Sequence, residues 1–510
     1  MRCHRWWSRQ LCRRAVRERE AREIHYGYIG RTGAYLSDVG LERMAHRQQR
    51  TLAAIRGACA VSPDGEQIDM QAIYAASIAN PHNRRMELIV RTKGIADWAQ
   101  REGYVGYAVA VTAPGRMHRC RTVGEGDTRR LIENDRWDGS TPRDTQRYLC
   151  KHWQHFRAQA KKHGYTVVGL RTVEPHKDGT PHWHLVLFVR PQHVRDALRR
   201  LRNNFLAVDG AERGARKRRV VCKRIKGGAD AAVAYALAYI SKNINGEGIE
   251  LDLESGLPAA DGAQRATLWA RIWGIRQFQT FGAPRITVWR ELRRVRDEAL
   301  QVVREFMAHA DPAIAQAAAG IAAGNLTPCA TVATAAMRAG RADVLDTLTR
   351  LRDVHLAGLV SDPAATLGES WIAANEGQFR RFIYAQVAAP VGLLKTERQN
   401  AYGETIPAVV GVVSAAGHEV ITREEGWSIR WGARAEKKGL GSAFAAQPRR
   451  GDAQRCPLGP VAITVTGVGN HYDNRQRGVE QFSREMCRDM ALRRRPKTPI
   501  YSFYPSGEFR

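Results

Sequence analysis

The sequence lacks the marks of several protein classes. Its 9 cysteines lie far apart and form no C-x-x-C pair, which argues against a zinc ribbon or a disulfide framework and favours a reducing compartment. It has no run of about 18 apolar residues, the length that a membrane-spanning helix needs. The N-terminus also lacks the apolar segment of a secretory signal. These absences predict a protein without a membrane partner.

Acidic residues are also scarce. The 510 residues include 51 Asp and Glu against 80 Lys and Arg, which gives a formal net charge of +29. A hydrophobic content of 44% with 26% charged residues is ordinary for folded domains and excludes a disordered, collagen-like or coiled-coil chain. The excess positive charge predicts a polyanionic partner. Nucleic acid comes first, because phosphate contacts by Lys and Arg supply most non-specific affinity; a membrane surface is the weaker alternative.

Hydrophobic periodicity predicts an α+β core whose elements follow the order β-α-β-β-α-β. This is the order of the ferredoxin-like, split βαβ fold, an antiparallel sheet in which the first and third strands are central neighbours and two helices cover one face. We expect the other face to be open and to hold a site beside an extra helix. The predicted strands are 104–112, 165–173, 182–189 and 220–225, and the predicted helices begin near 142, 191 and 229.

Composition divides the chain into four regions. The core occupies 101–245, between a largely helical, basic N-terminal region and an extension rich first in Gly and then in Trp and Arg. A mixed C-terminal region of unknown role follows. The expected boundaries are 1–100, 101–245, 246–300 and 301–510.

A strand with two histidines carries the sharpest chemical signal. Period two places His182 and His184 on one face, where two imidazoles can bind one divalent cation, and Glu174 on the preceding strand would complete the site. A three-residue turn would pair Glu174 with His184. The flanking Pro175 and Pro181 predict an irregular edge strand. The alternative is a partly exposed strand with incidental histidines.

Two tyrosines and a lysine share one face of the helix predicted near 229–243. Tyr235, Tyr239 and Lys242 stand at positions i, i+4 and i+7. A tyrosine can act as a covalent nucleophile, although its free pKa of about 10 makes it a weak one. Lys242 can lower the phenol pKa or contact a phosphate, and a nearby cation can polarise that phosphate. The alternative is that both tyrosines are amphipathic core residues.

Together these motifs resemble those of the HUH endonucleases and, more narrowly, the replication gene A proteins of bacteriophages. The resemblance covers about residues 100–290. Ala110 departs from the family's first motif, which is usually nearer to T-x-T. The matching segments are Ala110-Val-Thr112-Ala-Pro114, Glu174-Pro-His-Lys-Asp-Gly-Thr-Pro-His182-Trp-His184, Tyr235-x3-Tyr239-x2-Lys242 and Phe281-Gly-Ala-Pro284-x4-Trp289.

The resemblance implies a site-specific nickase that initiates rolling-circle replication on single-stranded or supercoiled origin DNA in the cytoplasm of a bacterial host. It implies that Glu174, His182 and His184 hold Mg²⁺ or Mn²⁺ against the scissile phosphate, with His176 as an alternative ligand. One tyrosine would attack and leave a 5′-phosphotyrosyl link with a free 3′-OH. The other would perform the later strand transfer, with Lys242 at the phosphate or at a tyrosine.

A basic segment enters the tyrosine helix. It is either a solvated charged loop or, beside a nicking site, a loop that contacts DNA phosphates, and we expect the second. Its eight basic residues are Arg213, Arg216, Lys217, Arg218, Arg219, Lys223, Arg224 and Lys226.

Other functions fit parts of the pattern. A transposase or a relaxase would use the same chemistry, and a non-catalytic basic DNA- or RNA-binding protein would keep the histidines for structure alone. The sequence has no G-x-x-x-x-G-K-S/T phosphate loop with which to unwind DNA. A helicase from the host is therefore an implied partner.

Overall fold

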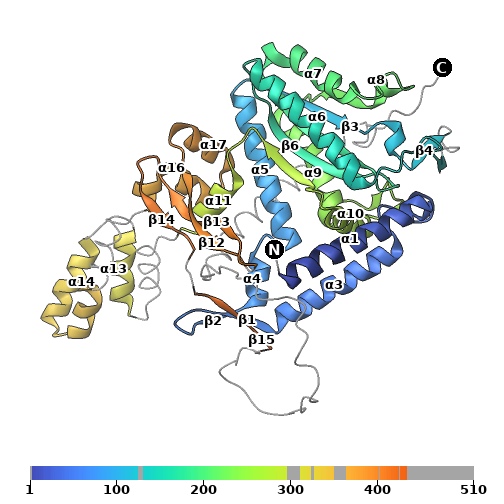
Figure 1. Cartoon of the computed structure of the whole chain (residues 1–510). Helices are drawn as coiled ribbons and strands as arrows, with labels where there is room; N and C mark the ends of the chain where they lie inside the picture. The colour runs from blue at the N-terminus through green and yellow to red at the C-terminus, as the bar shows by residue number, and fades with distance from the viewer. Residues whose placement is uncertain are drawn as a thin grey trace, which may run out of the picture. The chain divides into compact units, whose positions relative to one another are not determined.

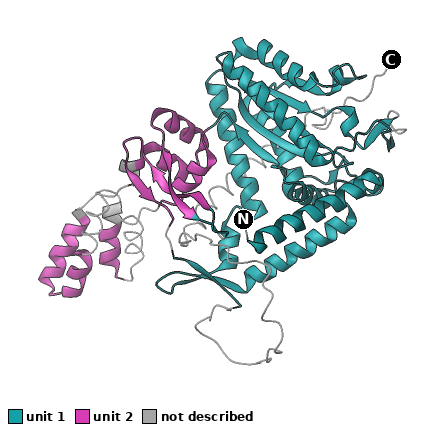
Figure 2. Cartoon of the chain, in the orientation of Figure 1, with its two compact units in different colours: residues 1–283, 399–404, 426–510 teal, residues 284–398, 405–425 magenta. Residues whose placement is uncertain are grey.

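The chain divides into two compact units (Figure 2). Unit 1 comprises residues 1–283, 399–404 and 426–510, and unit 2 comprises 284–398 and 405–425. Residues 433–510, part of the predicted C-terminal region, lie outside the described residues, and the four predicted region boundaries remain predictions. The structure, a computed structural model, describes residues 3–123, 130–295, 311–322, 327–349, 363–400, 402–423 and 426–432.

A five-stranded sheet forms the centre of unit 1 (Figure 1). Its order is β11-β6-β7-β3-β8, and every pairing in it is antiparallel. Four of the strands are the predicted ones, arranged as the split βαβ sheet requires, with the first (β3) beside the third (β7). The α+β class and the sheet are therefore confirmed, and β11 is an unexpected fifth strand. The bounds are β3 Val105–Val111, β6 Val168–Pro175, β7 Pro181–Val189, β8 Val220–Arg224 and β11 Phe278–Phe281.

Two helices cover one face of this sheet, as predicted. Helix α6 (Pro142–Lys162) begins with a capping box between Thr141 and Asp144 and has proline at its first position, both of which favour a helix start. Helix α7 (Val194–Leu206) follows a short 3₁₀ turn, Pro191–His193. The large side chains between helices and sheet are all less than 5% exposed: Leu149, Trp153, Phe156, Trp183, Leu185, Leu187, Leu201 and Phe205.

The opposite face is covered as well, which corrects the expectation of an open face. Helix α9 (Gly228–Ile244) contacts β3, β6 and β7, while α5 (Pro81–Arg101) contacts β6 and α9. The β3 residues beneath them include Gly106, Ala108 and Ala110, and such small side chains let a helix approach the sheet closely. Helix α5 buries ten residues, more than one amphipathic face provides, so its sequence pattern does not show where it packs. The candidate site is therefore enclosed between the sheet and α9.

The N-terminal region is largely helical, as predicted, and its turn at residues 62–65 closes a β-hairpin that the sequence did not indicate. Strand β15 (Ser428–Trp431), far away in sequence, pairs with the free edge of that hairpin. A second small hairpin lies between β3 and α6, and helix α10 packs on α9. The bounds are α1 His4–His25, α2 Tyr28–Arg31, α3 Asp38–Arg56, β1 Ala58–Val61, β2 Gln67–Asp69, α4 Met70–Ala76, β4 Cys120–Val123, β5 Arg130–Glu133, α8 Ala215–Arg218, β9 Leu251–Asp252, β10 Leu257–Pro258 and α10 Ala259–Trp273.

Unit 2 combines helices with a small three-stranded sheet of order β12-β13-β14. The rings of Trp289, Phe379 and Phe382 pack together at centroid separations of 5.0–5.5 Å. Among the described residues of either unit, no helix has both the length and the apolar character that crossing a membrane requires. The bounds are α11 Ile286–Leu292, α13 Pro312–Ala322, α14 Thr327–Arg338, α16 Pro363–Asn375, α17 Phe379–Ala388, β12 Gly392–Gln399, β13 Thr405–Val413 and β14 Glu419–Ile421.

Candidate active site

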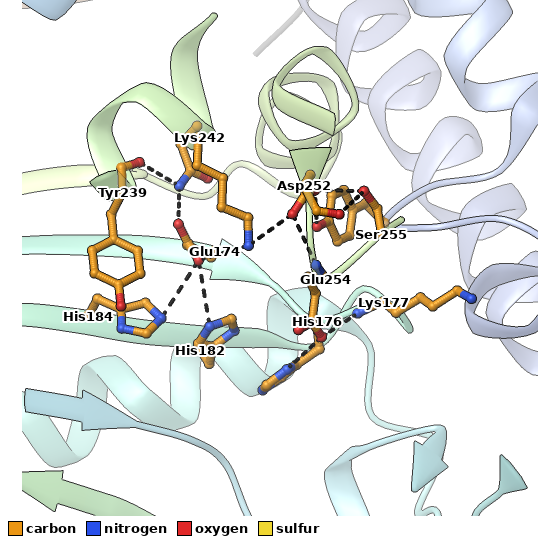
Figure 3. Close-up of polar contacts among 12 residues, drawn as sticks. Glu174, His176, Lys177, His182, His184, Tyr239, Lys242, Asp252, Glu254 and Ser255 are labelled. Atoms are coloured by element: carbon orange, nitrogen blue, oxygen red, sulfur yellow. Dashed lines mark hydrogen bonds and ion pairs between the residues drawn. The ribbon is translucent and has the colours of Figure 1, made fainter. Parts of the chain in front are cut away.

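The three predicted ligands come together on the adjacent strands β6 and β7 (Figure 3). Glu174 stands directly opposite His182, and Thr172 stands opposite His184. The expected pairing of Glu174 with His184 is therefore wrong by two residues. Because side chains alternate with a period of two, all three still share the face beneath α9. They are buried, with exposed fractions of 1% for Glu174, 2% for His182 and 7% for His184.

The turn between the strands explains the register. Pro175 pairs with Pro181, so the ladder closes around five residues instead of three. Inside this loop the His176 N–H donates to the Thr180 carbonyl and the Gly179 N–H donates to the His176 carbonyl, both at 2.8 Å. Strand β6 is also not an irregular edge strand, because β11 pairs along its outer side. Glu174 is thus carried by an interior strand held from both sides.

The ligand atoms converge on one small space. The Oε2 atom of Glu174 lies 3.7 Å from Nε2 of His182 and 3.6 Å from Nε2 of His184. All three ligand atoms are within 4.8 Å of one another. Both ring nitrogens of His182 are buried and have no hydrogen-bond partner among the described residues. Buried polar atoms are normally paired, so the unpaired nitrogens of His182 indicate a ligand-binding role. Two imidazoles and a carboxylate around one space fit a divalent cation.

Burial sets the protonation of these groups. It lowers the pKa of His182 and of His184 well below the ordinary value, and neighbouring cationic groups add to the effect. Burial also raises the pKa of Glu174, against the opposing effect of Lys242 and Asn243. Neutral imidazole is the form that coordinates metals. The histidines are therefore kept in the ligating form.

The two tyrosines of α9 share one helix face, as their spacing predicts, and this face contacts His184 of the histidine strand. The hydroxyl of Tyr235 lies 3.3 Å from Nδ1 of His184. The ring of Tyr239 stacks on the same imidazole with centroids 3.8 Å apart and 15° between the planes. Burial, followed by the neighbouring Tyr239, raises the pKa of Tyr235 well above its ordinary value. A single histidine thus connects the two tyrosines with the candidate cation position.

Lys242 contacts carboxylates in this structure. Its Nζ lies 3.4 Å from Oε2 of Glu174 and 3.2 Å from Oδ1 of Asp252 (Figure 3). Burial opposes its charge, but Glu174, Asp252 and Glu254 outweigh burial and raise the pKa of Lys242 above its ordinary value. Lys242 therefore shares one oxygen of Glu174 with the two histidines.

Four residues around the site were not predicted. Asn243 donates from Nδ2 to Oε1 of Glu174 and to the Tyr239 carbonyl, so it fixes the carboxylate from the side away from the histidines. Asp252 accepts from Tyr35 at 2.5 Å and from Ser255. Glu254 contacts Nδ1 of His176 at 3.3 Å. Acidic residues at 252 and 254 in so basic a chain were the available signal, but only the fold brings them to Lys242 and His176. The set is Tyr35, Asn243, Asp252 and Glu254.

His176, the alternative ligand, lies next to the three main ones. Its ring stacks on that of His182 at a centroid separation of 4.0 Å. Burial lowers its pKa, but the hydrogen bond and charge of Glu254 outweigh burial and raise the pKa above its ordinary value. A histidine held in this way by a carboxylate is less available to a cation than His182.

The basic segment separates into two parts. Arg219 is 2% exposed, and its guanidinium donates to the Asp209 carbonyl at 3.0 Å and to Oε2 of Glu212 at 2.6 Å, so its contacts are internal. The register places Lys223 opposite Ala108, on the face that also carries His184, and Arg224 opposite Tyr107 on the other face. The exposed members are Arg213, Arg216, Lys217, Arg218, Lys223, Arg224 and Lys226.

The chain is similar to several curated phage replication proteins. It is 36% identical over 321 residues to the replication gene A protein of Escherichia phage P2, and the aligned region covers 62% of this chain and 42% of the phage protein. It is 36% identical over 332 residues to the replication protein of Haemophilus phage HP1, and the aligned region covers 63% of this chain and 40% of the phage protein. It is 30% identical over 312 residues to a probable replication endonuclease from a prophage-like region of Salmonella typhimurium, and the aligned region covers 60% of this chain and 37% of that protein.

These matches cover less than half the length of each of these three relatives. No solved structure matches the chain at a significant level. The family model described as bacteriophage replication gene A protein matches residues 1–247, a range that includes the histidine strand and the tyrosine helix. Through residues 1–247, the chain therefore matches the family of bacteriophage replication gene A proteins.

Proposed function

We propose that this protein is a metal-dependent, site-specific DNA endonuclease that nicks one strand at a replication origin and so initiates rolling-circle replication of a phage. The match of residues 1–247 to the replication gene A family and the names of relatives such as the probable replication endonuclease support the replication role and the endonuclease activity. The origin strand, single or in supercoiled DNA, is the proposed substrate, and a host helicase in the bacterial cytoplasm is the proposed partner.

The arrangement around His184 carries this proposal. Its Nε2 lies 3.6 Å from Glu174, while its Nδ1 lies 3.3 Å from the hydroxyl of Tyr235. When Nε2 of a neutral imidazole serves as a ligand, the proton resides on Nδ1. His184 would then donate a hydrogen bond to the Tyr235 oxygen. A donor aimed at that oxygen stabilises a phenolate against the effect of burial.

The residues that would hold the cation are Glu174, His182 and His184. One carboxylate and two imidazoles can bind one divalent cation, for which we propose Mg²⁺ or Mn²⁺, with the remaining positions filled by oxygens of water or phosphate. When bound, the cation would polarise the scissile phosphate and stabilise the charge that develops on its oxygens. Asn243 would keep the carboxylate oriented by its hydrogen bond to Oε1. Lys242 would balance the charge of Glu174 and Asp252 between turnovers.

A tyrosine of α9 would attack the phosphorus. Its phenol loses a proton, the bond between the tyrosine oxygen and phosphorus forms, and the bond from phosphorus to the 3′ oxygen breaks. The 3′ oxygen takes up a proton, which leaves a 3′-OH and a 5′-phosphotyrosyl link. The second tyrosine would perform the later transfer in the same way. The 4.9 Å separation of the Tyr235 and Tyr239 ring centroids supports two nucleophiles that serve one phosphate position.

The test is covalent capture of a single strand. The full chain is incubated with end-labelled strands that tile the replication gene region of the source genome, with Mn²⁺, Mg²⁺ or a chelator. We expect a denaturation-resistant adduct that needs a divalent cation and is absent from the Tyr235→Phe, Tyr239→Phe double variant. Tyr165→Phe is a matched control outside the site. Strand binding without an adduct on any strand would leave only a non-catalytic DNA-binding protein.

A further inference from the structure

Four arginines from two distant parts of the chain gather at one place on unit 1. Arg13 and Arg17 stand one helical turn apart on α1, and Arg143 and Arg147 stand one turn apart on α6, a spacing that puts each pair on one helix face. Burial is the main cause that lowers the pKa of Arg17, and the charges of Arg143, Arg13 and Arg147 lower it further. The charges of the other three arginines therefore reach the guanidinium of Arg17.

Arg17 is fixed in place by another helix. Its Nε donates to the Ile272 carbonyl at 2.8 Å, in the last turn of α10. A guanidinium at the C-terminal end of a helix satisfies a free carbonyl and the helix dipole. This bond uses one of the five N–H groups of Arg17. A backbone carbonyl, and not a carboxylate, therefore fixes the guanidinium.

Acidic partners are scarce in this cluster. Within the described ranges, no carboxylate forms an ion pair with Arg13, Arg17 or Arg143, and Arg147 pairs with Asp144 at 3.2 Å. Elsewhere in unit 1, exposed arginines such as Arg14 and Arg199 pair with a carboxylate one turn away. Asp144 is thus the one carboxylate that pairs with this cluster among the described residues. The remaining positive charges repel one another, and a shared anion would lower this repulsion.

The cluster lies beside the turn of the site hairpin. Pro142, the residue before Arg143, packs against Gly179, where an added Cβ would lie 3.7 Å from the proline Cγ. The Trp269 indole donates to the Gly179 carbonyl at 2.9 Å, and it belongs to α10, the helix that also holds Arg17. Gly179 is in the turn between Glu174 and His182. The arginines and the candidate ligands are therefore joined by one packed region of unit 1.

We propose that Arg13, Arg17, Arg143 and Arg147 form a binding site for the phosphodiester backbone of a single DNA strand, next to the nicking site. The proposal rests on the proposed function for the identity of its anion. Guanidinium groups bind phosphate oxygens in a bidentate manner, and two pairs one helical turn apart can contact neighbouring phosphates of one strand.

The test is the salt dependence of DNA binding by the full chain without divalent cations. The probes are a labelled mixed-sequence single strand and its duplex, so no origin sequence is needed. The Arg13→Gln, Arg143→Gln variant removes two proposed contacts. The control, Arg43→Gln with Arg47→Gln, removes the same charge from exposed positions on α3. Each phosphate contact to a single strand adds about 0.7 to the salt slope.

We expect the cluster variant to reduce the salt slope on the single strand by about 1.4, with affinity at least about tenfold lower, and the control to change neither. Arg13→Lys with Arg143→Lys should keep the slope. An equal effect of the control, no effect of the cluster variant, or a loss confined to the duplex would overturn the proposal. These outcomes do not depend on catalysis, so the covalent-capture assay reports separately on the proposed function.

Discussion

The imidazole of His184 and the phenol ring of Tyr239 lie face to face, with centroids 3.8 Å apart and 15° between the planes. This stacking fixes the orientation of a ring whose two nitrogens point to different partners, Glu174 on one side and Tyr235 on the other. The position of the candidate cation ligand thus depends on a residue that also belongs to the tyrosine pair.

Replacing Tyr239 separates the contribution of its ring, which stacks on His184, from that of its hydroxyl. Tyr239→Phe keeps the stacked ring and should leave Mn²⁺ affinity unchanged, whereas Tyr239→Ala should weaken it about fivefold, because an aromatic pair is worth about 1 kcal/mol. Titration of Mn²⁺ by electron paramagnetic resonance measures both. Equal affinities for the Ala and Phe variants would show that stacking does not position His184.

Glu174 is expected to decide whether a cation binds. Glu174→Gln keeps the size of the side chain and its place beside Asn243 but removes the charge that faces both histidines. We expect Mn²⁺ affinity to fall at least about tenfold, and the thermal stabilisation that saturating Mn²⁺ gives the wild type to disappear. Glu133→Gln, on the β4–β5 hairpin, is the control. If Glu174→Gln bound Mn²⁺ as the wild type does, the cation site would lie elsewhere.

Lys242 and a cation compete for the same oxygen of Glu174. Lys242→Met should strengthen Mn²⁺ binding, because it removes a positive charge 3.4 Å from that oxygen. It should also lower the free energy of unfolding without metal by about 3 kcal/mol, since breaking a buried pair leaves a carboxylate uncompensated. Denaturant titrations with and without Mn²⁺ measure both effects. Weaker Mn²⁺ binding in this variant would contradict the competition.

Arg219 and Arg216 should behave differently although they are three residues apart. Arg219→Gln should lower the free energy of unfolding by about 3 kcal/mol, because it leaves buried carbonyls and Glu212 without their donor. Arg216→Gln should leave stability unchanged and weaken single-strand DNA binding. Urea denaturation and fluorescence anisotropy form the test. A stable Arg219→Gln variant with weakened DNA binding would reverse these assignments.

His118 should make unit 1 sensitive to acid. Burial lowers the pKa of His118 to about 4, although the charge of Asp178 opposes this shift. A histidine kept neutral in the folded state contributes stability above its unfolded pKa of about 6.5, and this stability is lost as the pH falls toward 4. The shift corresponds to about 3 kcal/mol. His118→Gln should flatten the fall in unfolding free energy between pH 7 and 4 by about this amount; an unchanged pH profile would contradict the assignment.

Much of the sheet and the central contacts of the site could be predicted from the sequence. Alternation along residues 182–189 gives the face of His182 and His184, and helical spacing gives that of Tyr235 and Tyr239. The register could not be predicted in the same way, because it depends on the proline pair that closes a five-residue turn. Periodicity predicts the face on which a side chain lies, but it does not predict which distant segment of the chain packs against that face.

For this reason the residues that complete the site were missed. Asp252 and Tyr35 meet although 217 positions separate them, and β11 joins the sheet through a four-residue strand that is too short to show alternation. Arg219 is indistinguishable in sequence from its exposed neighbours, since burial of one arginine among eight basic residues depends on where α7 ends.

The outer position of β11 has a practical consequence for work with shorter fragments. Cutting the chain at residue 247, where the family match ends, would remove β11 and leave the strand that carries Glu174 with an unpaired edge. Exposed strand edges recruit other chains and promote aggregation. Fragments intended for crystallisation or assay should therefore extend through Phe281, and the insolubility of a shorter fragment would say nothing about the catalytic residues.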